Sequence, residues 1–438
     1  MGIQDLIISP FYFFILLIVA FVIRPLVTNS ATKSYFIIGL LAKIVGAISL
    51  GLIYQFYYQG GDTFTFHTHG SRLIWQAFMD HPFLAVKMWL NSGGEFQGDI
   101  FKYTSNIWLY RDEASYFVIK IASFFDILTG STYSATALFF AAFAFSGHWA
   151  LFSTFQRLYP DQTKYLAIAC LFVPSVIFWG SGILKDSITL SALCWMTYAL
   201  FQITVWKSNP LRNIFLLVFF GWILFSIKIY ILLCFLAATS IFLYSKFSSQ
   251  INSALLRTFL KPFLMVLFLG LGYIVLQQIS QSDSRYALDK IAHTAMVTAH
   301  DIRYGWGARD GDNSGYTLGN LDGSFSSFLG LAPKGVIVTL FRPWPWEVKN
   351  PLMLLAATES LIILVFSVLV FIGAIFNSPI KLWVKLNDPI VLYCLTFSLL
   401  FAFAVGVSTY NFGTLMRYKI PVIPFYLITL TIAKTVRR

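Results

Sequence analysis

The sequence predicts an all-α polytopic membrane protein, and three observations lead to this fold class. The 438 residues are 58% hydrophobic and only 11% charged, whereas roughly a quarter of the residues of a soluble domain are charged. The mean hydropathy is +0.72. Apolar runs of about 20 residues, the length that a membrane helix requires, recur along the whole chain. We therefore expect a single transmembrane domain over residues 1–438.

The apolar runs predict about eleven spans. The first follows no basic segment and is long enough to cross a bilayer, so we expect a retained helix rather than a cleaved signal peptide. The predicted spans are Ser9–Val27, Tyr35–Tyr57, Tyr133–Phe155, Tyr165–Trp179, Ser187–Trp206, Leu211–Ile227, Ile229–Leu243, Pro262–Ile279, Leu352–Phe376, Pro389–Val407 and Ile420–Ile432.

The basic residues predict the topology of these spans. Lys and Arg gather on alternate short loops and on the C-terminal tail: Lys33, Arg157, Lys164, Lys207, Arg212, Lys246, Arg257, Lys261, Lys381, Lys385, Lys434, Arg437 and Arg438. Because cytoplasmic loops carry an excess of Lys and Arg, the N-terminus is expected outside and the C-terminus inside a plasma (inner) membrane. The same bias explains the net charge of +12 without a nucleic-acid partner.

The opposite side receives two long external loops, residues 59–132 and 280–351. Both are rich in Gly, Asp, Asn, Tyr, Trp and Arg, and long loops are commonly functional. The amphipathic stretches Trp75–Asn91 and Phe325–Phe341 are expected to form interfacial helices within them. Short turns at residues 180–186, at Lys228 and at residues 408–419 are expected on the same side.

Asp62 is the first candidate site residue, because it follows Gly60-Gly61 at the end of a predicted span. Its carboxylate could act as a general base for a hydroxyl, bind a metal, or be solvated. His67 and His69 could join Asp62 as ligands of a divalent cation, although no cofactor is needed otherwise. Acidic partners from the same loop are second candidates, or form a solvated cluster beside Arg111: Asp99, Asp112 and Glu113. The four cysteines lie in apolar runs and give no disulfide or metal pattern.

The turn containing Lys185 and Asp186 is the second candidate region. Ionisable residues so close to hydrocarbon usually face a cavity or a partner, which makes Lys185 a candidate phosphate contact and Asp186 its orienting partner. An internal Lys–Asp pair with helix capping by Asp186 is the alternative. The same two interpretations apply to Lys228.

The third candidate region joins two basic segments of the second half. Arg417 and Lys419 lie on the outer side, where the positive-inside rule does not explain them, so they could bind a lipid phosphate or extend to lipid headgroups. The stretch Arg342-Pro343-Trp344-Pro345-Trp346-Glu347 resembles an interface anchor. Arg342 and Glu347 could pair with each other or line a substrate groove.

Together, Asp62 after two glycines, the Lys185-Asp186 turn and Arg417-Tyr418-Lys419 resemble the GT-C superfamily of membrane glycosyltransferases. The stretch from Phe341 to Glu347 is also similar to bacterial membrane proteins of cell-surface polysaccharide assembly. The resemblance implies a GT-C-like fold and a polyprenyl-phosphate-linked sugar as donor, with a glycan or glycolipid acceptor at the outer face. Asp62 would be the base, and Lys185, Arg342, Arg417 and Lys419 would bind the donor phosphate.

Two alternatives stay open at this point. A polysaccharide polymerase or ligase of the O-antigen type would use arginines of the second loop: Arg285, Arg303, Arg309 and Arg342. A lipid or polysaccharide transporter would use Lys185, Asp186 and Lys228 as a relay, and it should carry ionisable groups near mid-span. Nearly all such groups are instead predicted at the outer rim, with Lys43 as the main exception.

Overall fold

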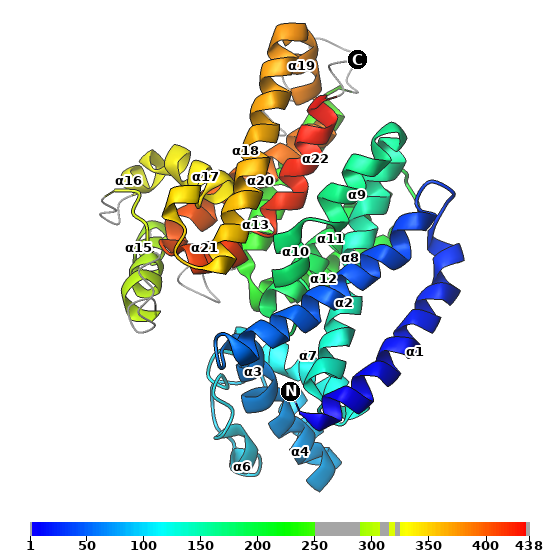
Figure 1. The fold of residues 1–438 in the computed structure, drawn as a ribbon, viewed down its shortest axis with the longest axis vertical. Helices are drawn as coiled ribbons and strands as arrows, with labels where there is room; N and C mark the ends of the chain where they lie inside the picture. Colours follow the sequence, from blue (N-terminus) through cyan, green and yellow to red (C-terminus); the bar gives the residue numbers. More distant parts are fainter. Residues whose placement is uncertain (1, 250–289, 307–314, 320–324, 435–438) are drawn as a thin grey trace. The chain divides into compact units, whose positions relative to one another are not determined.

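The computed structural model describes residues 2–249, 290–306, 315–319 and 325–434. Every regular element in these ranges is helical, and one isolated bridge pairs Gly315 with Asn411. The chain forms two compact units, Met1–Leu232 and Leu233–Arg438 (Figure 1). The helical fold class predicted from the sequence is thereby confirmed.

The first unit contains α1 to α12 and the start of α13. Its elements are α1 (Ile3–Val27), α2 (Lys33–Phe56), α3 (Asp62–Phe66), the π-helix η1 (His67–Ser71), α4 (Arg72–Asp80), α5 (Pro82–Leu90), α6 (Phe101–Thr104), α7 (Glu113–Thr129), α8 (Tyr133–Leu158), the 3₁₀ helix η2 (Pro160–Gln162), α9 (Thr163–Leu171), α10 (Pro174–Trp179), α11 (Lys185–Thr204), α12 (Pro210–Ile227) and α13 (Ile229–Ser249).

The second unit takes up the rest of α13 and continues to the C-terminal helix. Its further elements are α15 (Ile291–His300), the π-helix η4 (Asp301–Trp306), α16 (Phe325–Gly330), α17 (Ala332–Phe341), the 3₁₀ helix η5 (Pro345–Glu347), α18 (Pro351–Asn377), α19 (Pro379–Leu386), α20 (Pro389–Thr409), α21 (Phe412–Tyr418) and α22 (Val422–Lys434).

Eight helices of the described residues are long and apolar enough to cross a membrane: α1, α2, α8, α11, α12, α13, α18 and α20. The pair α21 and α22, bent by 62°, would add a ninth as one broken span. These helices support a membrane-embedded protein. The predicted span Pro262–Ile279 lies outside the described residues.

The predicted span Tyr165–Trp179 is not one helix. It is divided into α9 and α10, because Pro174 lacks an amide proton and favours an extended residue before it, and Val173 has the extended φ of −74° and ψ of 124°. The predicted interfacial stretch Trp75–Asn91 is divided in the same way, because the extended residue His81 precedes Pro82 at the start of α5. The stretch Phe325–Phe341 is divided at Leu331 into α16 and α17. The α7 helix within the first loop was not predicted.

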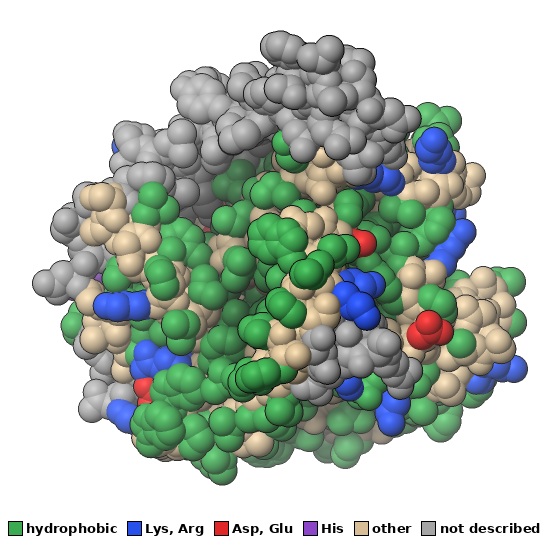
Figure 2. All heavy atoms as spheres, turned by 90° about the horizontal axis from the view of Figure 1, so that it is seen from above, with side chains coloured by type: hydrophobic (Ala, Val, Ile, Leu, Met, Phe, Trp, Pro, Cys, Tyr) green, Lys and Arg blue, Asp and Glu red, His purple; other side chains and the backbone are tan. Residues whose placement is uncertain are grey.

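The first unit is built around α8. This helix packs against α1, α2, α7, α9 and α11. In its most apolar 18-residue stretch 78% of the residues are buried, whereas in that of α1 only 6% are. The exposed apolar side chains of α1 suit a lipid-facing position. Hydrophobic side chains dominate the face seen in Figure 2, with charged side chains scattered over it.

The second unit is built around α20, which packs against α15, α17 and α22. The contact between α17 and α20 is close because Gly335 and Gly406 face each other, and a Cβ on Gly406 would collide with the Gly335 backbone. Small residues allow such close approach of membrane helices. Thr339 Oγ1 also donates to Ala402 O at 2.7 Å across this contact, so the position of α17 is fixed by α20.

Candidate functional site

Asp62 occupies the position that its glycines predicted. Gly60 and Gly61 have φ of 145° and 110°, values that side chains rarely tolerate, and the chain turns there from α2 into α3. Gly61 lies against the Tyr54 ring, which also contacts Trp179 with ring centroids 6.3 Å apart. Asp62 is exposed. Its segment and the end of α10 therefore share one end of α2.

Four charged residues meet at the start of α11 and form what we call the polar cluster: Asp112, Lys185, Asp186 and Lys228. Lys185 Nζ lies 2.9 Å from Asp112 Oδ2, which ties the first loop to the turn at residues 180–186. Lys228 Nζ lies 2.5 Å from Asp186 Oδ1. The segments predicted on one side of the membrane thus converge at one end of the first unit. Asp186 is engaged by Lys228, a residue 42 positions away in the sequence.

The two pairs of the polar cluster differ in exposure. The side chains of Lys228 and Asp186 are 8% and 1% exposed, whereas those of Lys185 and Asp112 are 19% and 50% exposed. Partial burial raises the pKa of Asp112, but the charge of Lys185 and the hydrogen bonds from Ser115 outweigh it and hold the pKa below its usual value. Asp112 is therefore a carboxylate at neutral pH.

His67 and His69 have separate partners. His67 is fully buried, with Nε2 3.4 Å from Asp126 Oδ1, and Asp126 Oδ1 accepts from Thr136 Oγ1 at 2.6 Å. His69 stacks on Trp108 with ring centroids 3.9 Å apart. Among the described residues, Asp62 and the two histidines do not form a group able to hold a metal ion, and no other three His, Cys, Asp or Glu side chains do so.

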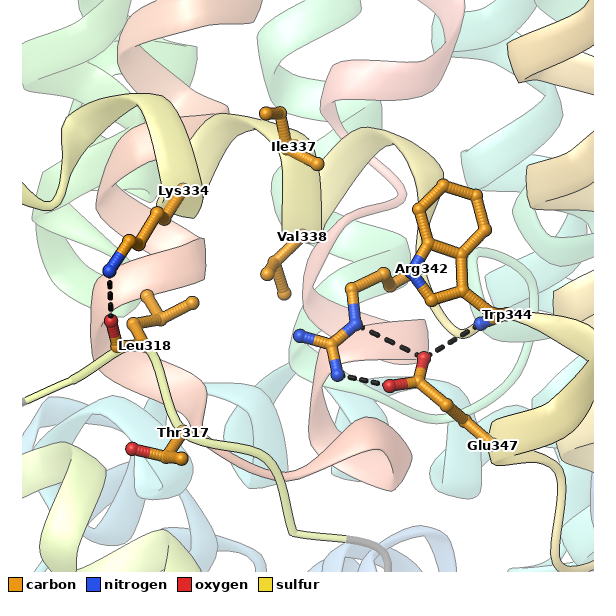
Figure 3. Close-up of a pocket in the computed structure, with 8 residues that line it drawn as sticks. All are labelled: Thr317, Leu318, Lys334, Ile337, Val338, Arg342, Trp344 and Glu347. Carbon is orange, nitrogen blue, oxygen red and sulfur yellow. Dashed lines mark hydrogen bonds and ion pairs between the residues drawn. The ribbon is translucent and has the colours of Figure 1, made fainter.

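A pocket of about 360 Å³ lies beside α17 in the second unit, and we call it the α17 pocket. Lys334, Ile337 and Val338 line it from one face of α17, because residues three and four apart lie side by side on a helix. The rest of the lining comes from Thr317, Leu318, Arg342, Trp344 and Glu347 (Figure 3). The lining combines two cations and one carboxylate with an indole and three aliphatic side chains. Such a mixed lining suits an amphiphilic anion.

Arg342 is held on several sides of this pocket. Glu347 binds its guanidinium with both oxygens, one of them 3.1 Å from Nε, and also accepts from Trp344 N at 2.8 Å. The guanidinium lies 5.3 Å and 5.0 Å from the ring centres of Tyr316 and Phe412, within the range of cation–π attraction. Arg342 and Glu347 thus both pair with each other and line a groove, the two roles that the sequence left open.

Lys419 is buried and binds the backbone of Arg342. Its ammonium donates to Arg342 O at 3.0 Å and to Ser360 Oγ at 2.7 Å, and the side chain is 1% exposed. These contacts give Lys419 a supporting place rather than a direct contact with a ligand. Arg417 is half-buried on α21 and is not among the described residues that line the α17 pocket.

Several residues of these sites were missed from the sequence. Lys334 lies in the predicted interfacial stretch Phe325–Phe341 and Thr317 in the second loop, and only the fold brings them beside Arg342. Asp126 carried a usable signal, since an acidic residue within the apolar run Phe124-Phe125-Asp126-Ile127-Leu128 needs a partner. Of the predicted polymerase arginines, Arg285 and Arg309 lie outside the described residues, as does the side chain of Arg303.

Comparison of the chain with known protein families, with curated proteins and with solved structures finds no match.

Proposed function

We propose that the chain is a membrane glycosyltransferase that moves a sugar from a polyprenyl-phosphate-linked donor to a glycan or glycolipid acceptor at the outer face of the membrane. The α17 pocket is the observation that carries this proposal. Its volume of about 360 Å³ lies in the usual range of ligand pockets, roughly 300–1,000 Å³. Lys334 and Arg342 suit a phosphate, and Leu318, Ile337 and Val338 suit the first isoprene units.

Charge balance in the pocket suits a phosphate in particular. Glu347 neutralises Arg342, so the lining keeps one net positive charge from Lys334, whose Nζ donates to Leu318 O at 3.1 Å. An arriving phosphate can accept from the remaining donors of both cations without displacing Glu347. Trp344 presents an indole next to these groups, as a flat apolar surface for a sugar ring.

The reaction transfers the sugar from one oxygen to another. The acceptor hydroxyl oxygen attacks the anomeric carbon and forms the new glycosidic bond, while the bond from that carbon to the phosphate oxygen breaks. The hydroxyl proton passes to a carboxylate base, the role that the resemblance gives to Asp62, and the polyprenyl phosphate leaves with the electron pair. Phosphate leaves readily when cations stabilise its charge, so the carboxylate is the main catalytic need.

The polar groups of the first unit favour transfer over transport. Asp62 is exposed, and the polar cluster lies at the end of the unit where the first loop folds over α11. A transport relay would need mobile ionisable groups at mid-span, yet Lys43 is held there by three acceptors, Val176 O, Gly180 O and His148 Nε2.

The proposal is tested in a strain whose chromosomal copy of the gene is deleted. We expect a lipid-linked sugar intermediate to accumulate, and a plasmid copy of the chain to clear it. Asp62→Asn should clear it about 10²- to 10⁴-fold more slowly at equal protein level, because it removes the general base. Asp161→Asn, which changes an exposed carboxylate in η2, is the matched control and should act like the parent chain.

Three results would redirect the proposal. Undiminished clearance by Asp62→Asn would overturn the role of the carboxylate. Accumulation of a complete lipid-linked repeat unit, instead of a single-sugar lipid, would identify a polymerase or ligase. An unchanged amount of the lipid-linked intermediate, with a change in its distribution between the two leaflets, would identify a transporter.

A further inference from the structure

Lys43 is a buried cation in the interior of the first unit, and the proposed reaction does not use it. It lies near the middle of α2 with a side chain that is 1% exposed. Its ammonium lies 2.9 Å from Val176 O, 3.0 Å from Gly180 O and 3.3 Å from His148 Nε2. A lysine ammonium has three donors, so all three are used here.

The tautomer of His148 completes this arrangement. His148 Nδ1 lies 2.8 Å from Ala144 O, and because a carbonyl can only accept, Nδ1 carries the proton. Nε2 is then left with its lone pair and accepts from Lys43.

The two carbonyls belong to the end of the short helix α10. Val176 O already accepts from Gly180 N at 3.2 Å, and Gly180 O lies beyond the last helical residue of α10. The C-terminal end of a helix also favours a cation. Lys43 therefore adds a donor, from α2, to the carbonyl end of the broken helix, where unpaired carbonyls are costly in a membrane interior.

The same face of α2 continues this contact toward the polar cluster. Gly46 lies directly against the Ile177 carbonyl, Leu50 against Gly182, and Tyr54 against Trp179. Residues 43, 46, 50 and 54 recur at helical spacing and so form one stripe. The contacts along the stripe run from the Lys43 ammonium to the turn that ends at Lys185 and Asp186.

We propose that Lys43 is a positioning residue: its ammonium clamps α10 and the turn at residues 180–184 onto α2, and thereby sets where Lys185 and Asp186 begin α11. The inference stands independently of the proposed function, because the clamp would position the polar cluster for any activity at this end of the unit.

The test measures opening of the turn by labelling a cysteine within it. All four native cysteines are buried, so the purified parent chain should react slowly with a water-soluble maleimide. Ser181→Cys places a fully buried reporter in the turn, and Ser123→Cys places an equally buried control on α7. Each is combined with Lys43→Met, which keeps the length of the side chain and removes its donors.

We expect Lys43→Met to raise the labelling rate at position 181 about tenfold or more and to leave position 123 unchanged, since local opening follows the loss of the hydrogen bonds that oppose it. Lys43→Gln keeps an amide donor and should give an intermediate rate. An unchanged rate at 181, or equal increases at both positions, would overturn the clamp. Failure of both Lys43 variants to accumulate would also overturn it, in favour of a general folding role.

Discussion

The Asp186–Lys228 pair of the polar cluster and the Arg342–Glu347 pair of the α17 pocket both join a cation to a carboxylate, but the two pairs differ in access. The Asp186–Lys228 pair is 1% and 8% exposed and is enclosed by protein. Arg342 and Glu347 are 19% and 18% exposed and line a pocket. Removing charges from water is costly, so a buried pair mainly fixes structure, whereas a pair at a pocket wall can still meet a ligand. The exposed fraction thus distinguishes a charged pair that is enclosed by protein from one that a ligand can reach.

The largest effect expected from this contrast is on stability. Asp186→Asn leaves the Lys228 ammonium without its carboxylate and should lower the free energy of unfolding by about 3–5 kcal/mol. Thermal unfolding of the purified protein in detergent measures it. The double variant Asp186→Leu with Lys228→Met removes both charges and should recover most of the loss. A loss of less than about 1 kcal/mol for Asp186→Asn would show that burial of the pair does not matter.

A smaller effect is expected at the pocket, and on binding rather than on stability. Arg342→Ala should weaken binding of a long-chain polyprenyl phosphate about 10- to 100-fold, the range for hydrogen bonds to a charged group. Arg342→Lys keeps the charge but loses the planar guanidinium that Glu347 binds, so its affinity should lie between those of the parent chain and Arg342→Ala. Native mass spectrometry in detergent measures the affinities. Equal affinity for all three proteins would remove Arg342 from the binding site.

The smallest effect belongs to the exposed pair of the polar cluster. Asp112→Asn should change the free energy of unfolding by about 1 kcal/mol or less, because half of the Asp112 side chain is exposed and water screens such pairs. A cost comparable to that of Asp186→Asn would break the contrast between the two neighbouring pairs of α11.

The pH dependence of this pair follows from the direction of its shift. The pKa of Asp112 is lower in the folded chain than in the unfolded one, so the carboxylate stabilises the fold above the ordinary carboxyl pKa of about 4. That contribution is lost as the pH falls through the folded value. The free energies of unfolding of the parent chain and of Asp112→Asn, followed by thermal unfolding, should therefore converge at acid pH. If the difference in free energy of unfolding between the two proteins stayed constant down to pH 3, roughly one unit below the ordinary pKa, the lowered pKa of Asp112 would be contradicted.

The sequence predicted the helical class and the places where the chain leaves its helices. The Gly60-Gly61 turn, the Lys185-Asp186 turn and the Arg342–Glu347 pairing could be anticipated, because glycine, proline and charge act locally. The residues with which these charged side chains pair could not be anticipated. Asp186 pairs with Lys228 and Lys419 donates to the Arg342 backbone, because such long-range contacts depend on how distant helices pack. Pro174 also turned one predicted span into two short helices.

The most direct test of the account compares two ligands of the purified parent chain. A long-chain polyprenyl phosphate and the polyprenol of the same length differ only in the phosphate, so native mass spectrometry of both isolates its contribution. We predict that the polyprenyl phosphate binds at least about tenfold more tightly than the polyprenol and that Arg342→Ala removes most of this difference. Equal binding of the two lipids to the parent chain would contradict the assignment of the α17 pocket to a lipid-linked phosphate.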